Sequence, residues 1–198
     1  MWGDPINKTM KKYFTSDLHL GHRRILEYCN RPFKSMERMN EVLINNINSR
    51  AKEEDLVIHV GDFACYGKER GTECNRTNPI TYFNQIKANT ILVKGNHDIN
   101  NKVKYMCNGL IVSLGKIGSV TVSHYPTNDL HCPQEFRTKS TQLGYHICGH
   151  VHSLWKHYYD KENNKLNINV GIDVWNYQIV SEDELISYIC KVKKELGL

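Results

Sequence analysis

The sequence predicts an α/β fold, a sandwich with a mixed sheet in a single domain. Short apolar runs alternate with helical patterns in the first half of the chain, whereas the second half is mostly strand-like. The chain has 198 residues and is 40% hydrophobic and 24% charged, which suits one continuous core. We find no internal repeat, low-complexity tract or linker that would divide it.

Helices and strands are assigned from apolar periodicity and from the residues that flank each segment. Ser35 is the expected N-cap of the second helix, and Ser181 with Glu184 forms a capping box that opens the last one. We expect strands at 13–15, 56–60, 90–94, 110–114, 117–123, 145–148, 153–159 and 165–172, helices at 22–30, 36–50, 80–87 and from 181 to about 196, and loops at 64–79 and 126–143.

Charge, cysteine content and hydropathy restrict the class of protein. The formal charge of +5 agrees with an anionic ligand, but the basic residues are scattered rather than grouped in a stripe. The seven cysteines include no CxxC pair, so we expect reduced thiols and a cytoplasmic protein. No apolar run approaches the ~18 residues of a membrane span. We interpret residues 1–11 as a leader and residues 12–198 as the folded domain.

Polar residues that can bind a metal follow the ends of several expected strands. Because the carboxyl ends of neighbouring strands meet in one crevice of an α/β sheet, we expect these side chains to converge. Side chains two apart on an extended stretch point the same way, so His150 and His152 are expected to act as a pair, as are Asp17 and His19. The candidate ligands are Asp17, His19, Asp62, Asn96, His124, His150 and His152.

Seven candidate ligands are too many for one open catalytic ion. If one carboxylate is shared, they suit two ions with about four protein ligands each. Oxygen and imidazole donors without thiolate favour Mn, Fe, Zn or Ni over Mg or Ca. The residues therefore predict two divalent transition-metal ions, with manganese as the first choice.

The order of the motifs extends this prediction to a family. The stretches "DLH", "GD", "GNHD", a separate His and "GHVH" occur in that order from Asp17 to His152. This series resembles the calcineurin-like metallophosphoesterase superfamily, and "SDLHLGH", "NRPF" and "SHYP" resemble its small, cap-less members from bacteria and bacteriophages. The resemblance implies a four-layer α/β/β/α sandwich with mixed sheets over about the whole chain.

The resemblance also implies a role for each site residue. The first ion is expected at Asp17, His19, Asp62 and His152, and the second at Asp62, Asn96, His124 and His150. A hydroxide that bridges the two metals would attack phosphorus, and His97 would contact the phosphate or protonate the leaving oxygen. Asp98 would orient His97 or a metal-binding histidine. His22 and Arg23 are expected to contact the substrate phosphate.

One motif departs from the protein phosphatases of this superfamily. Where those enzymes have GDxxDRG, this chain has "GDFACYG", so Cys65 and Tyr66 replace the second Asp and the Arg. Asp98 likewise replaces the Glu of their GNHE motif. The arginine that binds the dianion of a phosphomonoester is thus missing from its usual position. Basic residues of the loop that could replace it are Lys68, Arg70 and Arg76.

These departures favour a phosphodiesterase that acts on a small phosphoester, such as a cyclic nucleotide or another nucleotide-type ester. A phosphomonoesterase or nucleotidase is the alternative. A nuclease, with nucleic acid as partner, lacks the support of a basic stripe, and a non-catalytic scaffold would be expected to have lost ligands that this chain retains.

Asp173, after "NVGI", is interpreted as a turn residue. The oligomeric state is left open.

Overall fold

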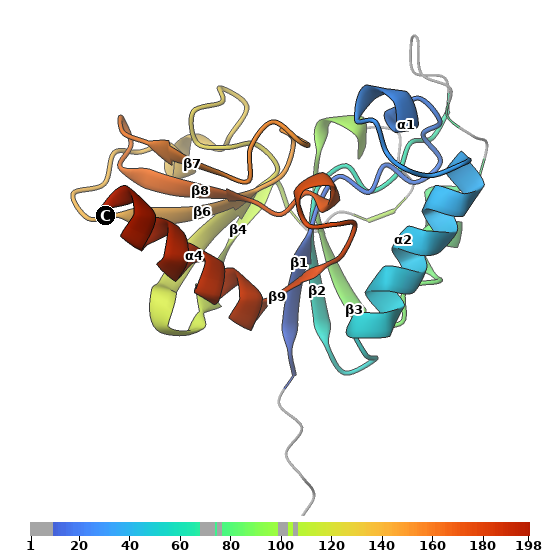
Figure 1. The fold of residues 1–198 in the computed structure, drawn as a ribbon, viewed down its shortest axis with the longest axis horizontal. Coiled ribbons are helices and arrows are strands. Elements are labelled where there is room, and N and C mark those ends of the chain that lie inside the picture. The colour runs from blue at the N-terminus through green and yellow to red at the C-terminus, as the bar shows by residue number, and fades with distance from the viewer. Residues whose placement is uncertain (1–9, 68–73, 75–76, 99–102, 105–106) are drawn as a thin grey trace, which may run out of the picture.

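Two β-sheets and the helices that cover them form the protein (Figure 1). The structure is a computed structural model, and it describes residues 10–67, 74, 77–98, 103–104 and 107–198. Residues 1–9 of the expected leader lie outside the described residues, and the first strand begins at Lys12.

The first sheet has four strands in the order β3-β2-β1-β9. Strands β1 (Lys12–Thr15), β2 (Leu56–Val60) and β3 (Asn89–Val93) are parallel to one another. Strand β9 (Val180–Ser181) pairs with β1 in the antiparallel direction. It was not predicted, because it is only two residues long and leads directly into the last helix.

The second sheet has five strands in the order β4-β5-β6-β8-β7. Parallel pairs join β5 to β6 and β6 to β8, while the outer pairs are antiparallel. The strands are β4 (Gly109–Leu114), β5 (Gly118–Ser123), β6 (Gly144–Cys148), β7 (His157–Asp160) and β8 (Lys165–Asn169). Both sheets are mixed, which confirms the predicted α/β sandwich in a single domain.

The two long helices begin and end close to where the sequence predicts them. They are α2 (Met36–Arg50), capped by the Ser35 hydroxyl, and α4 (Glu182–Leu196), which opens on the predicted capping box. Two helices are shorter than the predicted 22–30 and 80–87: α1 (Ile25–Tyr28) and α3 (Pro79–Phe83). Helix α1 cannot continue because Asn30 has a left-handed backbone (φ 48°).

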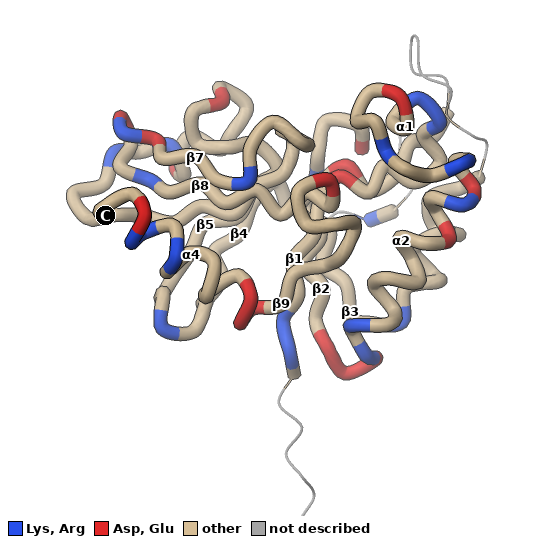
Figure 2. Tube along the Cα trace, viewed as in Figure 1, with Lys and Arg blue, Asp and Glu red and all other residues tan. Residues whose placement is uncertain are grey.

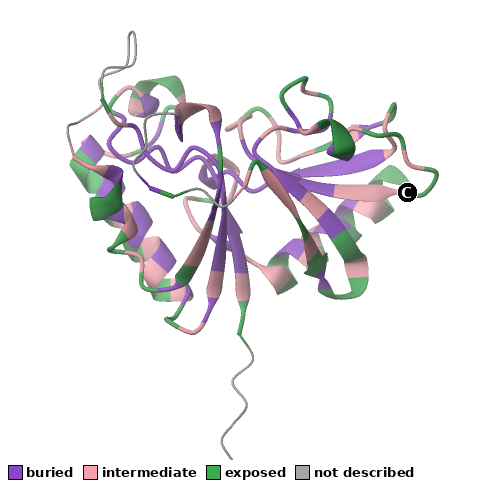
Figure 3. Ribbon diagram, turned by 180° about the vertical axis from the view of Figure 1, so that it is seen from behind, coloured by how far each residue is buried: buried purple, intermediate pink, exposed green. Residues whose placement is uncertain are grey.

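Alternating residues of the first sheet pack in two different apolar cores. Figure 3 shows buried residues on the strands of both sheets. Tyr13 and Leu92 pack against α2, whereas Phe14 and Val93 pack in a cluster with the second sheet and α4. The buried apolar residues of the helices are Met36, Met39, Leu43, Ile44 and Ile47 in α2 and Leu185, Ile189 and Val192 in α4. Both faces of the first sheet are therefore buried. Because one face packs against the second sheet, the carboxyl ends of its strands lie next to that sheet.

Candidate metal centre

The residues that follow β1, β2 and β3 meet those that follow β5 and β6 at one end of the sandwich. The backbone N–H of His150 donates to both carboxylate oxygens of Asp17, at 3.1 Å each. A second contact between residues of the two sheets joins His124 and Asp62: His124 Nε2 lies 3.3 Å from Asp62 Oδ2. All seven candidate ligands belong to this connected group, and four of them are buried: Asp17, His19, Asp62 and His124.

The backbone at this end of the sandwich is unusual for residues with side chains. Five of the seven candidates have a left-handed backbone: Asp17 (φ 59°), His19 (φ 50°), Asp62 (φ 57°), His150 (φ 69°) and His152 (φ 46°). Their side chains therefore converge through left-handed turns after the strands, and not through the β alternation expected from the sequence. Such conformations are strained and persist only where the surrounding structure enforces them, which is typical of functional sites.

Two glycines allow the segments to approach one another. A Cβ atom at Gly95 would collide with the Asp62 carboxylate, and one at Gly149 would collide with Ser16 and Asp17. Both glycines directly precede a candidate ligand. The absence of a side chain at these two positions therefore permits the close approach of the turns.

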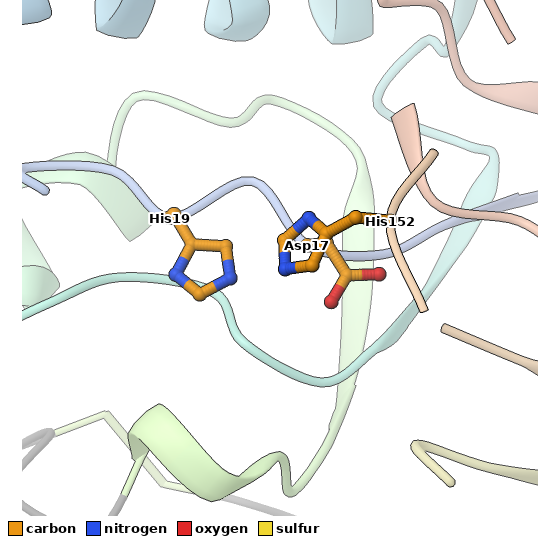
Figure 4. Close-up of side chains that lie close together, drawn as sticks. All are labelled: Asp17, His19 and His152. Atoms are coloured by element: carbon orange, nitrogen blue, oxygen red, sulfur yellow. The ribbon is translucent and has the colours of Figure 1, made fainter. Parts of the chain in front are cut away.

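The first group of candidate ligands consists of Asp17, His19 and His152 (Figure 4). One ligand atom from each lies within 4.8 Å of the others. The rings of His19 and His152 are stacked, with centroids 5.1 Å apart. One carboxylate and two imidazoles thus lie close together, and they come from the turn after β1 and the turn after β6.

The second group consists of Asn96, His124 and His150. The Asn96 side-chain oxygen lies 3.0 Å from His124 Nε2 and 3.1 Å from His150 Nδ1. The two imidazole rings are 5.1 Å apart at an angle of 70°. This group contains no carboxylate of its own.

Asp62 lies between the two groups. Its Oδ2 atom is 3.4 Å from His19 Nε2 in the first group and 3.3 Å from His124 Nε2 in the second. Its Oδ1 atom accepts a hydrogen bond of 2.8 Å from the backbone N–H of His97, which fixes the carboxylate. This is the position that a ligand shared by two ions would need.

The protonation pattern of the histidines fits metal ions. His124 Nδ1 lies 2.9 Å from the carbonyl oxygen of Val60, so in a neutral ring the proton is on Nδ1. The lone pair of Nε2 then faces the oxygens of Asn96 and Asp62, which is unfavourable unless a metal ion or a second proton lies between them. The Nε2 atom of His19 is buried and has no hydrogen-bond partner among the described residues. A buried ring nitrogen that has no hydrogen-bond partner is an expected ligand of a cation.

The electrostatics of the group also favour a cation. Burial would lower the pKa of His124, but the Asp62 carboxylate raises it to about 9. Burial would likewise raise the pKa of Asp62, but His124 and His19 hold it well below its usual range. Burial raises the pKa of Asp17 and lowers that of His19. The negative potential that attracts a proton to His124 would equally attract a metal ion.

Asp173 and Arg31 belong to this site, although neither was predicted to. Asp173 Oδ2 lies 2.9 Å from His152 Nδ1, and Arg31 forms an ion pair with the same carboxylate. Asp173 had been interpreted as a turn residue. The signal that could have identified it is that it follows the buried strand β8, as the other polar residues follow theirs.

Asp98 contacts the backbone of the site. Its carboxylate accepts hydrogen bonds from the backbone N–H groups of Asp62 (2.8 Å), Phe63 (3.0 Å) and Gly95 (2.8 Å). It therefore ties the turn after β2 to the turn after β3. Its expected role of orienting a histidine ring stays a prediction.

The predicted substrate-contacting residues differ in position. The ring of His97 lies 5.0 Å from that of His19 and 5.9 Å from that of His22, measured between centroids. His22 is buried, and its Nε2 atom has no hydrogen-bond partner among the described residues. Arg23 is exposed and lines a separate surface pocket of about 470 Å³ with Leu26 and Lys34. The structure thus brings His97 and His22 to the ligands, but places Arg23 at the surface.

A pocket of about 720 Å³ opens beside Asn96. Tyr125 and His131 form one wall, and the Tyr125 ring is 4.7 Å from that of His150. Lys94 also lines this pocket. A cavity of this size can hold a small organic group next to the candidate ligands.

The cysteines of the loop after β2 differ from the expectation. The structure pairs Cys65 with Cys74 as a disulfide, with Cα atoms 5.5 Å apart, whereas reduced thiols were expected. The spacing in the sequence gave no signal, because it is not a CxxC pair. Three basic residues of the same loop were considered as phosphate ligands. They lie outside the described residues: Lys68, Arg70 and Arg76.

Charges are distributed over the surface without a single-sign stripe in the view of Figure 2, which draws basic and acidic positions next to one another on several elements. This agrees with the scattered basic residues of the sequence. Within the described ranges, none of the helices is both long and apolar enough to span a bilayer.

Comparisons with known proteins agree with the motifs. Residues 10–178 match the model of the calcineurin-like phosphoesterase superfamily domain. An uncharacterised protein of Methanocaldococcus jannaschii is 29% identical over 184 residues, which cover 92% of this chain and 93% of that protein. The gene 66 protein of Mycobacterium phage L5 is 25% identical and aligns over 94% of this chain and 97% of its own length.

A solved structure shows the same fold. The crystal structure of a protein of unknown function from Aquifex aeolicus superposes with a TM-score of 0.65 at 22% identity. The match covers 91% of this chain and 100% of the other one.

Proposed function

The chain belongs to the calcineurin-like phosphoesterase superfamily, and from this premise we propose that it is a binuclear phosphodiesterase for small, nucleotide-type substrates. Membership implies metal-dependent hydrolysis of phosphoric esters. The number of ions, the residues that hold them and the preference for a diester are our proposals.

We assign one ion to Asp17, His19, Asp62 and His152, and the other to Asp62, Asn96, His124 and His150. The observation that carries this assignment is the position of Asp62 Oδ2, 3.4 Å from a histidine nitrogen of the first group and 3.3 Å from one of the second. When bound, two divalent ions would acidify a water molecule and neutralise charge on the phosphoryl oxygens. The mixed oxygen and imidazole donors suit manganese, iron, zinc or nickel, and we take manganese as the first candidate.

His97 is the proposed proton donor. Its backbone N–H is bonded to Asp62, and its ring lies next to those of His19 and His22. The ring is half-buried, so it can reach a substrate in the site and donate a proton to the leaving oxygen. His22, whose Nε2 is free of hydrogen bonds among the described residues, is proposed to contact the phosphate. We keep the exposed Arg23 as a second candidate for that contact.

A diester is the proposed substrate because a diester has one negative charge and two substituents. Cys65 and Tyr66 stand where related protein phosphatases have an aspartate and a dianion-binding arginine, and Cys65 is held in a disulfide. The pocket beside Asn96 offers room for one of the two substituents. Its aromatic wall suits a nucleoside-type group.

A phosphomonoesterase is the second candidate, and Lys94 is the observation that favours it. This lysine lines the pocket beside Asn96. Its ammonium group could pair with the second negative charge of a monoester, in place of the missing arginine.

The experiment compares the hydrolysis of bis-p-nitrophenyl phosphate with that of p-nitrophenyl phosphate in the presence of Mn²⁺. We expect faster cleavage of the diester, and loss of the activity after EDTA treatment and in Asn96→Ala. Asn128→Ala, a change of an exposed asparagine outside the site, should keep wild-type activity. Faster cleavage of the monoester would refute the diesterase and support the second candidate. Activity that survives EDTA would refute the metal centre.

A further inference from the structure

Arg31 and Asp173 are buried next to the proposed first ion, and the function proposed above gives them no role. We infer that these two residues position His152 as a metal ligand, by fixing the orientation of its ring and the nitrogen that carries its proton. The inference rests on the proposed metal centre, because it assigns a task toward an ion that His152 would hold.

The contact between Asp173 and His152 leaves one nitrogen free for a metal. Asp173 Oδ2 lies 2.9 Å from His152 Nδ1. A carboxylate accepts hydrogen bonds and donates none, so in the neutral imidazole the proton is on Nδ1. The lone pair is then on Nε2, on the opposite side of the ring. A carboxylate behind a metal-binding histidine commonly acts in this way.

Arg31 holds Asp173 in that position. Its guanidinium group donates from Nε to Asp173 Oδ1 at 2.8 Å and from a terminal nitrogen to Oδ2 at 3.0 Å. This two-point contact restricts both the place and the plane of the carboxylate. The two side chains are 0% and 2% exposed, so solvent does not compete for them.

The same arginine is also bonded to the other side of the first group. Its terminal nitrogens donate to the carbonyl oxygens of Asp17 (2.7 Å) and Leu18 (3.0 Å). Arg31 therefore connects the turn that carries Asp17 to the carboxylate that orients His152. The two ligands come from distant parts of the chain, and this side chain links them in addition to the hydrogen bonds from the His150 backbone to Asp17.

A different interpretation of these residues is a separate metal site. Ligand atoms of Cys29, His152 and Asp173 lie within 4.8 Å of one another. However, both oxygens of Asp173 are already bonded to the Arg31 guanidinium, whose permanent positive charge would repel a cation. The geometry therefore favours a positioning role over a third ion.

The first test needs no substitution. The zinc-loaded wild-type protein is examined by ¹H–¹⁵N NMR of the histidine side chains. We expect a slowly exchanging, downfield Nδ1–H proton on His152, with Nε2 bound to metal. A proton on Nε2 and a metal-bound Nδ1 would overturn the inference.

The second test measures zinc affinity by calorimetry. In Asp173→Asn, the affinity for one of two ions should fall by about 10- to 100-fold, while the other ion binds as in the wild type. Arg31→Lys keeps the charge but loses the two-point contact, and should lower the same affinity by a smaller factor. Asp160→Asn, which changes another buried carboxylate away from the site, should bind both ions normally and serves as the control.

The outcomes separate this inference from the proposed function. Wild-type affinity for both ions in folded Asp173→Asn would overturn the positioning role and leave the metal centre intact. Should Asp173→Asn fail to fold, Arg31→Lys and the NMR measurement decide in the same way. If the wild-type protein binds fewer than two ions, the binuclear centre itself is refuted, and the inference is refuted with it when His152 holds no ion.

Discussion

The two ligand groups of the centre are held by different chemistry. In the first, His152 is bonded to the Asp173 carboxylate, which is itself paired with Arg31. In the second, His124 is bonded to a backbone carbonyl, and the neutral Asn96 takes the place of a carboxylate. The proposed first ion would thus have two carboxylate ligands and the second only the shared Asp62. Because attraction between charges is strong in a buried site, the first ion should bind more tightly than the second.

The largest expected effect is that of Asp62→Asn, which removes the carboxylate common to both groups. Both ions should be lost at micromolar concentrations, and kcat/KM for the preferred ester should fall by roughly a thousandfold or more, because the charge stabilisation depends on the ions. Elemental analysis and steady-state kinetics measure the two effects. Asp160→Asn is the matched control. Retention of two ions with full activity would show that Asp62 is not shared.

His97→Gln should affect the chemistry without affecting either ion. The ring lies next to His19 but holds no proposed ion, so two ions should remain bound. The value of kcat should fall by about a hundredfold for an alkyl leaving group, which needs a proton, and much less for p-nitrophenolate. An equal loss with both leaving groups would contradict the role of proton donor.

The buried histidines His59 and His124 differ in the direction of their pKa shifts. Burial lowers the pKa of His59 to about 3, whereas Asp62 raises that of His124 to about 9. The unfolded chain binds a proton at His59 near pH 6.5 and the folded chain only near pH 3. This residue therefore contributes full stability above pH 6.5, and that contribution is lost as the pH falls toward 3.

Replacing His59 should reduce this loss of stability at acid pH. Between pH 7 and pH 5, the free energy of unfolding of the wild type should decrease by about 2 kcal/mol more than that of His59→Leu. Urea denaturation at the two pH values measures the difference. Parallel losses in the two proteins would mean that His59 is protonated in the folded state.

The smallest expected effect is that of Asn96→Asp, which makes the two groups more alike. A second carboxylate should raise the affinity for the more weakly bound ion by about tenfold and leave the affinity for the more tightly bound ion unchanged. Calorimetric titration should show the two dissociation constants moving closer together. A change in the tighter site alone would mean that Asn96 belongs to the other group.

Much of this arrangement could be predicted from local sequence features. The strands of the first sheet are short apolar runs that end in polar turns, and the capping box at Ser181 marks the last helix. The seven candidate ligands were identified because each follows an expected strand. Asp17, His19, Asp62 and Asn96 converge because β1, β2 and β3 are parallel, and His124, His150 and His152 because β5 and β6 are parallel.

Other features depend on contacts that no local pattern reveals. Arg31 and Asp173 are 142 positions apart, and no role was assigned to either until the fold brought them together, although Arg31 lies in the "NRPF" stretch that resembles the family. The partners of Asp98 are backbone amides, which have no signature in the sequence. The left-handed backbone of His150 and His152 is likewise hidden, because that conformation is imposed by the surrounding structure on residues that do not favour it.

The proposed centre consists of seven residues that hold two ions and share Asp62. Anomalous X-ray diffraction from crystals of the Mn²⁺-loaded protein tests it most directly. We predict two anomalous peaks on either side of Asp62, one against Asp17, His19 and His152 and the other against Asn96, His124 and His150. A single peak, or two peaks of which one lies away from Asp62, would contradict the account.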